Sequence, residues 1–372
     1  MKLEGYRIVD LSQFLPGPHL TMMMADHGAD VIKIEAPGGG DPGREIGLKQ
    51  DGETVFFRNT NRGKRSVCLD LKNPAARNTL MQLIDTADVF VEAFRPGVAD
   101  RLGCDAETVL ARNPRIVYCS ISAFGQTGPY RDFPAHDLAV EAFAGALSVN
   151  LGADDHPAMP GVPAADMASS LMALSGILMA LLRREKTGRG DRIDISMHDC
   201  LVASLPNVLG TVFVEDRAPI PKHERTWGGS AFYNVYTTGD GRSVVLGAQE
   251  IKFVRNLLTE LGRPDFIALC EQGPGTHQQP VVDFLGETFR TRTRAAWIEW
   301  FRGRDVSFAP VHDLREALDD PQLAAREMLL RDQRGRRRLG IPIKFALEPG
   351  TAKFAVPSYG EHTADVLGEL EA

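Results

Sequence analysis

The chain lacks the cysteine patterns of disulfide-stapled and zinc-binding proteins. Its 372 residues include only five cysteines, and no two of them form a Cys-x-x-Cys pair. Scattered single cysteines are typical of free or buried thiols in a reducing compartment. The nine histidines are also dispersed, without a His-x-x-x-His pair flanked by acids, so we expect no metal site.

Long apolar runs and an excess of positive charge are missing too. The longest apolar run covers residues 171–182, shorter than the roughly 18–20 residues that a membrane-spanning helix needs. The first residues lack the charged-then-apolar pattern of a secretion signal. The net charge of −7 argues against general nucleic-acid binding. We therefore expect a cytoplasmic protein with neither a membrane nor a nucleic acid as its partner.

Two nucleotide-binding fingerprints are absent. The turn after the first expected strand reads Leu15-Pro16-Gly17-Pro18 instead of Gly-x-Gly-x-x-Gly, and no Gly-Lys-Ser or Gly-Lys-Thr occurs. These absences exclude a conventional dinucleotide-binding enzyme and a P-loop protein.

What the sequence does contain is a repeated alternation of short apolar strands and helical segments. Its pattern predicts strands at 6–11, 30–35, 66–71, 89–93, 116–122 and 191–196, with helices at 17–28, 74–87, 106–112, 168–184 and 198–214. This alternation predicts a Rossmann-like, doubly wound α/β fold with a parallel sheet.

The pattern changes after about residue 215. Strands at 231–236 and 243–248 are joined by Thr238-Gly239-Asp240-Gly241, which indicates a hairpin turn. Helices at 251–261, 280–290 and 294–301 and a strand at 306–311 follow. We predict a large domain from 1–215 plus about 330–372, and a smaller α+β domain at about 225–325.

A histidine and an aspartate are expected to meet in one cleft. The turn-rich Gly125-Gln126-Thr127-Gly128-Pro129 leads to His136, and a small-residue loop at 159–165 leads to Asp166 at the start of an apolar helix. Such a pair can transfer protons. Spacing alone leaves an alternative, in which Asp137 and Asp166 only cap the helices that begin there.

Basic residues flank two of the expected strands. Arg95 follows a strand, at the edge where open α/β sheets bind ligands, whereas Arg62, Lys64 and Arg65 precede one. Because guanidinium groups match phosphate oxygens, these residues favour a phosphorylated ligand. For the run at 62–65 the alternative is solvated surface charge.

The chain resembles the family III CoA-transferases, a group that includes formyl-CoA transferase, carnitine CoA-transferase and the α-methylacyl-CoA racemases. The matching segments are Gly17-Pro18, residues 28–35, residues 61–66, Ala87-Asp88-Val89, Arg95-Pro96-Gly97-Val98, residues 125–129 and residues 184–190 leading into Asp194. The resemblance implies a large Rossmann-like domain completed by the C-terminal tail, a smaller domain, and an interlocked homodimer. It also implies an acyl-CoA substrate, with no cofactor beyond CoA and no metal.

The resemblance assigns roles to the candidate residues. Arg62, Lys64, Arg65 and Arg95 would contact CoA, near the turn at Gly125, and the thioester would reach Asp166. In the transferases the aspartate at this position attacks the thioester and forms a mixed anhydride and then an enzyme–CoA thioester. In the racemases the aspartate and a histidine exchange the α-proton of a 2-methylacyl-CoA through an enolate.

Several segments favour the racemase arrangement. His136 stands where many transferases carry a non-basic residue, and Glu250 lies in a stretch similar to the racemase segment that holds an acid near the catalytic pair. The segment at 228–233 is also racemase-like, and Leu15 replaces a glutamine of formyl-CoA transferase. Residues 141–145 look closer to the transferases, and Ala139-Val140 and residues 167–170 depart from the racemase pattern. We predict α-methylacyl-CoA racemase activity with His136 and Asp166 as the acid/base pair, oriented by Asp137 and Glu250, and CoA transfer as the alternative.

Overall fold

A computed structural model describes residues 1–152 and 154–371 and divides the chain into two compact units. The first unit comprises Met1–Ala146, Met159–Ser204 and Pro321–Ala372, and the second comprises Leu147–Ala158 and Leu205–Asp320. The sequence predicts a division near residue 215. The structure divides the chain at 205 and adds the segment 147–158 to the second unit.

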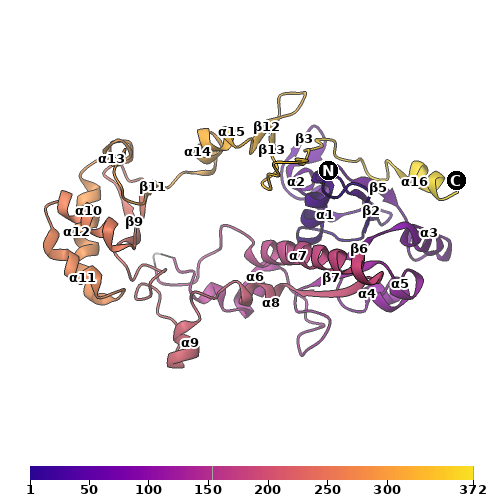
Figure 1. The fold of residues 1–372 in the computed structure, drawn as a ribbon, viewed down its shortest axis with the longest axis horizontal. Coiled ribbons are helices and arrows are strands. Elements are labelled where there is room, and N and C mark those ends of the chain that lie inside the picture. The colour runs from indigo at the N-terminus through magenta and orange to yellow at the C-terminus, as the bar shows by residue number, and fades with distance from the viewer. Residues whose placement is uncertain (153, 372) are drawn as a thin grey trace. The chain divides into compact units, whose positions relative to one another are not determined.

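A six-stranded parallel sheet forms the centre of the first unit (Figure 1). The strands are β1 (Arg7–Asp10), β2 (Asp30–Glu35), β5 (Arg65–Cys68), β6 (Val89–Glu92), β7 (Val117–Ser122) and β8 (Asp191–Ser196). Their order is β5-β2-β1-β6-β7-β8, and every neighbouring pair is parallel. This is the predicted doubly wound α/β fold, and the strand order reverses between β1 and β6.

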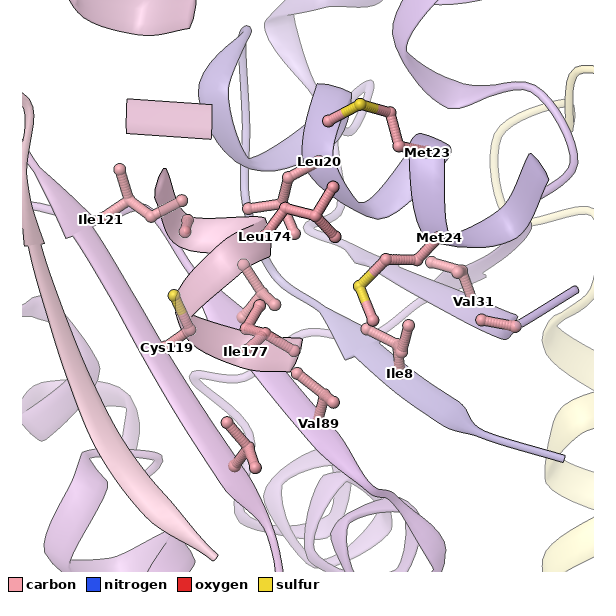
Figure 2. Packing of buried hydrophobic residues seen from close by; sticks show 14 of the residues in the cluster. Ile8, Leu20, Met23, Met24, Val31, Val89, Cys119, Ile121, Leu174 and Ile177 are labelled. Atoms are coloured by element: carbon pink, nitrogen blue, oxygen red, sulfur yellow. The ribbon is translucent and has the colours of Figure 1, made fainter. Parts of the chain in front are cut away.

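Helices cover both faces of this sheet. On one face α1 (Pro16–Asp26), α7 (Ala164–Thr187) and α8 (Met197–Ala203) bury an apolar layer. Figure 2 shows Met24 of α1 and Ile177 of α7 against strand residues such as Ile8. On the other face α3 (Pro74–Thr86), α5 (Ala106–Arg112) and α16 (Thr363–Glu371) pack on the sheet. Each large apolar side chain buried here stabilises the fold by about 1.5–3 kcal/mol.

The helix α7 is longer than predicted and strongly apolar. Among the described residues it is the one helix whose length and composition would allow it to cross a membrane, a property that the core helix of a globular fold shares. Here Ala173, Ile177 and Leu181 lie in the core between α7 and the sheet. The helix is therefore a structural layer of the first unit.

The C-terminal segment returns to the first unit and covers the edge strand β5. The backbone N–H of His362 donates to the carbonyl of Ser66 at 2.9 Å, and the N–H of Cys68 donates to the hydroxyl of Thr363 at 3.0 Å. The smaller elements of this unit are β3 (Lys49–Gln50), β4 (Glu53–Thr54), α2 (Val55–Asn61), α4 (Val98–Leu102), α6 (Asp137–Phe143), α15 (Pro321–Ala325), β12 (Leu329–Arg331) and β13 (Arg337–Leu339).

The second unit has its own sheet and core. The predicted hairpin forms between β9 (Tyr233–Thr237) and β10 (Ser243–Gly247), and β11 (Phe308–Pro310) pairs with β10. Helices α10 (Ile251–Glu260), α12 (Gln279–Arg290) and α13 (Arg294–Phe301) pack against this sheet, with shorter α9 (Gly210–Glu215), α11 (Ile267–Glu271) and α14 (Leu314–Leu318). Buried Trp297 donates its indole N–H to the carbonyl of Phe289 at 2.8 Å.

One predicted helix is wrong. The segment 198–214 is not continuous, because α8 ends at Ala203 and α9 begins only at Gly210. Pro206 lies in this gap. A proline has no backbone N–H to donate and disfavours the helical conformation of the residue before it, so the helix stops there.

Candidate active site

A cavity of about 390 Å³ opens where the strand order of the large sheet reverses. Its walls are the loops that follow β1, β6 and β7, including Gln13, Phe94 and Ser122. Because the carboxyl ends of parallel strands meet at one edge, these loops converge there. All of the lining residues belong to the first unit.

The structure brings His136 and Asp166 to this cavity from two different helices. His136 stands directly before α6, and Asp166 lies in the first turn of α7. Among the described residues, no hydrogen bond joins the two side chains. They share one cavity as the sequence predicts, and their roles in a reaction stay predictions.

The beginning of α7 is capped by carboxylates of α6. The Asp137 carboxylate accepts a hydrogen bond from the backbone N–H of Asp166 at 2.9 Å, and buried Glu141 accepts one from Ala164 at 3.0 Å. These contacts satisfy N–H groups that a helix start leaves free. Asp137 therefore caps α7, the helix that carries Asp166. The alternative drawn from the sequence, in which Asp137 caps its own helix α6, is not what the hydrogen bonds show.

Three carboxyl groups crowded at one helix end change their proton affinity. Burial, together with the negative charges of Asp137 and Glu141, raises the pKa of Asp166 to about 7. Burial also raises the pKa of Glu141, as does its contact with Asp137. At neutral pH Asp166 is thus present in both protonation states. It can serve as a nucleophile when ionised or as an acid when protonated.

The His136 imidazole is exposed and makes no hydrogen bond to any described residue. Its ring contact is with Phe14, edge-on, with the centroids 5.6 Å apart and the planes at 77°. Phe14 belongs to the loop after β1 and lines the same cavity.

Arginines gather beside the cavity around Gly97, which stands at the start of α4 with φ +80°. A Cβ built on Gly97 would lie 3.6 Å from Arg101 Nη1 and 4.0 Å from Arg131 Nη2. Arg131 and Arg95 line the cavity itself. Within the described chain, neither Arg95 nor Arg101 pairs with a carboxylate, whereas Arg131 pairs with Asp132 at 3.1 Å. Sequence reasoning found Arg95 and missed Arg101 and Arg131, although Arg101 follows Arg95 by less than two helical turns.

The other predicted CoA-binding cations have carboxylate partners within the fold. Arg62 pairs with Asp26 at 2.6 Å, and Lys64 pairs with Asp10 at 2.9 Å, all four side chains being buried. Burial lowers the pKa of Lys64 to about 8.

Arg65 lies nearer the surface, where Asp30 and Glu369 hold it, both at 2.6 Å. A contact of Arg62, Lys64 and Arg65 with CoA stays a prediction, and their ion pairs give each a structural role besides.

Gly125 and Glu250 stand apart from the cavity lining. Gly125 has φ +81° in the turn after β7, and the next residue, Gln126, donates its backbone N–H to the Asp194 carboxylate at 3.0 Å. Glu250 stands directly before α10 in the second unit. The predicted contribution of Gly125 to CoA binding and of Glu250 to the His136/Asp166 pair both stay predictions.

Residues 3–363 match the family model of CoA-transferase family III. The chain belongs to this family. It is 33% identical over 385 residues to a succinate–glutarate CoA-transferase of Agrobacterium fabrum, covering 99% of this chain and 96% of that protein. It is also 33% identical to an acetyl-CoA:oxalate CoA-transferase of Acetobacter aceti, over 92% of this chain and 89% of that protein.

The solved structures agree with this assignment. The crystal structure of a CAIB/BAIF family protein from Brucella suis superposes with a TM-score of 0.84 at 28% identity, over 99% of this chain and 98% of that one. The resemblance to the family is thereby confirmed over nearly the whole chain. The racemase prediction finds no specific support, because both curated relatives are named as CoA-transferases.

Proposed function

We propose that this family III enzyme transfers CoA from an acyl-CoA to a free carboxylic acid, with Asp166 as the nucleophile. The observation that carries the proposal is that the Asp166 carboxylate lines the cavity. Burial and the charges of Asp137 and Glu141 raise its pKa to about 7. A carboxylate of higher pKa is a better nucleophile once it is ionised. The names of the relatives favour transfer over our first prediction, racemisation.

The reaction consists of balanced acyl exchanges at Asp166. The ionised carboxylate attacks the thioester carbonyl carbon, the carbon–sulfur bond breaks, and a mixed anhydride and CoA thiolate result. The thiolate then attacks the aspartyl carbonyl, which releases the donor acid as a carboxylate and leaves an aspartyl–CoA thioester. The acceptor carboxylate repeats the two steps in reverse order, so that acyl-CoA leaves and the Asp166 carboxylate is regenerated. No metal or cofactor beyond CoA takes part in these steps.

The phosphate groups of CoA would bind to Arg95, Arg101 and Arg131. Their guanidinium groups lie beside the cavity around the Gly97 backbone, and a planar guanidinium matches phosphate oxygens. This assignment extends the predicted role of Arg95 to Arg101, which follows it in the chain, and to Arg131, which the fold places beside the same glycine.

The acyl group and the acceptor are proposed to be short dicarboxylic acids. Two arginines and His136 line the cavity, whereas Asp166 is its one carboxylate among the lining residues. Such a lining suits an anionic acid. The curated relatives named for succinate, glutarate and oxalate support the same class.

Racemisation remains the second candidate because of one observation. His136 lines the same cavity as Asp166, and an acid and a base near one substrate can remove an α-proton and return it on the other face. In transfer the imidazole makes and breaks no bond, and it contributes only by orienting the acyl group or the acceptor acid.

Trapping the aspartyl intermediate tests the proposed function. The enzyme is mixed with succinyl-CoA and then treated with hydroxylamine or borohydride, and the peptide containing Asp166 is analysed by mass spectrometry. We expect a hydroxamate or an alcohol at Asp166, and transfer of CoA to glutarate in untreated samples. Asp166→Asn is the control, and it should give neither adduct nor transfer.

A parallel incubation of a 2-methylacyl-CoA in D₂O separates the two candidates. Under the transfer proposal the α-proton is retained. Loss of the α-proton together with no adduct at Asp166 would establish the racemase and reject the transferase.

We also propose that two copies of the chain associate, as the resemblance implies. The outer face of α7 exposes Leu171, Met179 and Leu182 by 49, 65 and 71%. A large apolar surface on one helix is typical of a face that a second subunit covers.

A further inference from the structure

The loop after β1 is held by buried charge. The carbonyl of Ser12 accepts a hydrogen bond from Lys33 Nζ at 2.8 Å, and the N–H of Ser12 donates to Asp10 at 2.9 Å. Lys33 in turn pairs with Asp41 at 2.8 Å, with the two side chains 0 and 1% exposed. A buried ion pair that also hydrogen-bonds the backbone fixes a loop conformation strongly.

Phe14 occupies a costly backbone conformation within this loop. Its φ is +63°, in the left-handed region, which is unfavourable for a residue other than glycine. The N–H of Phe14 donates to Asp41 at 3.2 Å, the same carboxylate that pairs with Lys33. Such strain persists only where the surroundings determine the conformation, and it clusters at functional sites.

The strained backbone directs the Phe14 ring at His136. The ring is 37% exposed at the cavity and makes the edge-on contact described above. The imidazole has no hydrogen-bond partner among the described residues, so this ring contact is a main interaction that can restrict its orientation. An edge-to-face pair of rings is stabilised by more than the apolar area that it buries, because the positive ring edge faces the negative ring face.

We propose that Phe14 is a positioning residue for His136, held in place by the buried Lys33–Asp41 pair. The inference deepens the proposed function by giving His136 a defined orientation toward the reacting acyl group. The positioning role of Phe14 rests on the proposed function in one respect, namely that the reaction takes place in this cavity.

A double-mutant cycle tests the coupling. Phe14→Leu removes the ring and should lower kcat for CoA transfer about tenfold, since small misplacements of a group that orients the substrate are costly, while KM for the acyl-CoA stays within about twofold. In a His136→Gln background the same substitution should change kcat less than about twofold. Equal losses in the two backgrounds would overturn the proposal.

A matched control is available in the same cavity. Phe133 also lines it, but its ring packs on Phe124 and Phe143, at 6.1 and 5.5 Å. Phe133→Leu should therefore act independently of His136→Gln. Phe14→Tyr, which keeps the ring, should restore kcat to within about twofold.

A second readout does not depend on activity. In protein with ¹³C-labelled histidine, the ring C–H resonance of His136 is assigned by its loss in His136→Gln. We expect this resonance to move in Phe14→Leu and to keep its position in Phe133→Leu. If Phe14→Leu does not fold, Phe14→Gly serves, because glycine adopts a positive φ without strain.

The two readouts separate the two proposals. A resonance that moves in an enzyme without CoA-transferase activity would reject the proposed function and keep the positioning contact. An active enzyme whose His136 resonance does not respond to loss of the Phe14 ring would reject the positioning role.

Discussion

Asp166 is surrounded by negative charge although it begins a helix. A helix N-terminus stabilises a nearby carboxylate, yet burial and the charges of Asp137 and Glu141 outweigh that effect and raise the pKa of Asp166. The ionised form of Asp166 thus lowers the stability of the folded protein, while its raised pKa keeps the carboxyl able to bind a proton near neutral pH.

The free energy of unfolding should show this cost as pH rises. A carboxyl group whose folded pKa is raised loses stability as pH rises from its unfolded pKa, near 4, to its folded pKa, about 7. Asp166→Asn should therefore be more stable than the wild type by an amount that grows over this range. The gap should reach about 2 kcal/mol above pH 7, less than the full shift implies because the side chain stays partly open to water. Urea unfolding between pH 4 and 8 measures it, and a pH-independent gap would contradict the raised pKa.

Removing the neighbouring charge should move the pH dependence of activity. Asp137→Asn keeps the size of the side chain and an oxygen that accepts from Asp166, but removes one negative charge that raises the pKa of Asp166. The rising limb of kcat/KM, near pH 7 in the wild type, should move to lower pH. Rates measured from pH 5 to 9 check this, and an unmoved limb would mean that another group controls it.

At the level of the elements, α6 and α7 share one set of carboxylates. Asp137→Ala removes a cap from the N–H of Asp166 and should destabilise the protein by about 1 kcal/mol. Asp137→Asn should cost less, because the amide oxygen still accepts the hydrogen bond. Thermal unfolding of the two variants checks the prediction, and equal effects would show that the charge rather than the hydrogen bond matters.

The limits of sequence reasoning are also visible in the elements. Alternating apolar strands and helices predict β1, β2, β6 and β7 closely, because a buried parallel strand leaves a short apolar run in the sequence. The largely exposed edge strand β8 is predicted instead by its alternation of polar and apolar residues. The predicted continuous helix at 198–214 is wrong because its apolar spacing runs across Pro206. A proline interrupts a helix through its own backbone, so this break can be predicted from the sequence.

At the level of the whole molecule, the fold determines which residues can meet. The two loops that the sequence locates, at 125–129 and 159–165, lead to His136 and Asp166, which line one cavity in the structure. The ion pairs of Arg62 and Lys64 join residues 36 and 54 positions apart, and no local pattern reports such partners. The choice between transfer and racemisation also stays open in the sequence, since both reactions use the aspartate.

Association of two copies can be tested through α7. The enzyme should sediment as a dimer, and Leu182→Lys, which places a charge on the exposed apolar face, should shift it to the monomer. Leu182→Met keeps the apolar area and is the control. A wild-type monomer at micromolar concentration would reject the proposed homodimer.

The return of the C-terminal segment to β5 has a consequence for synthesis on the ribosome. β5 is the edge strand of the large sheet, and its backbone groups bond to His362 and Thr363. These residues are translated only after the whole second unit. The nascent chain therefore carries an uncovered strand edge while more than a hundred residues are added, and an uncovered edge is a site for pairing with other chains. A chaperone that binds nascent chains would bind at this edge of β5. After release from the ribosome, His362 and Thr363 cover the edge and the chaperone is no longer required.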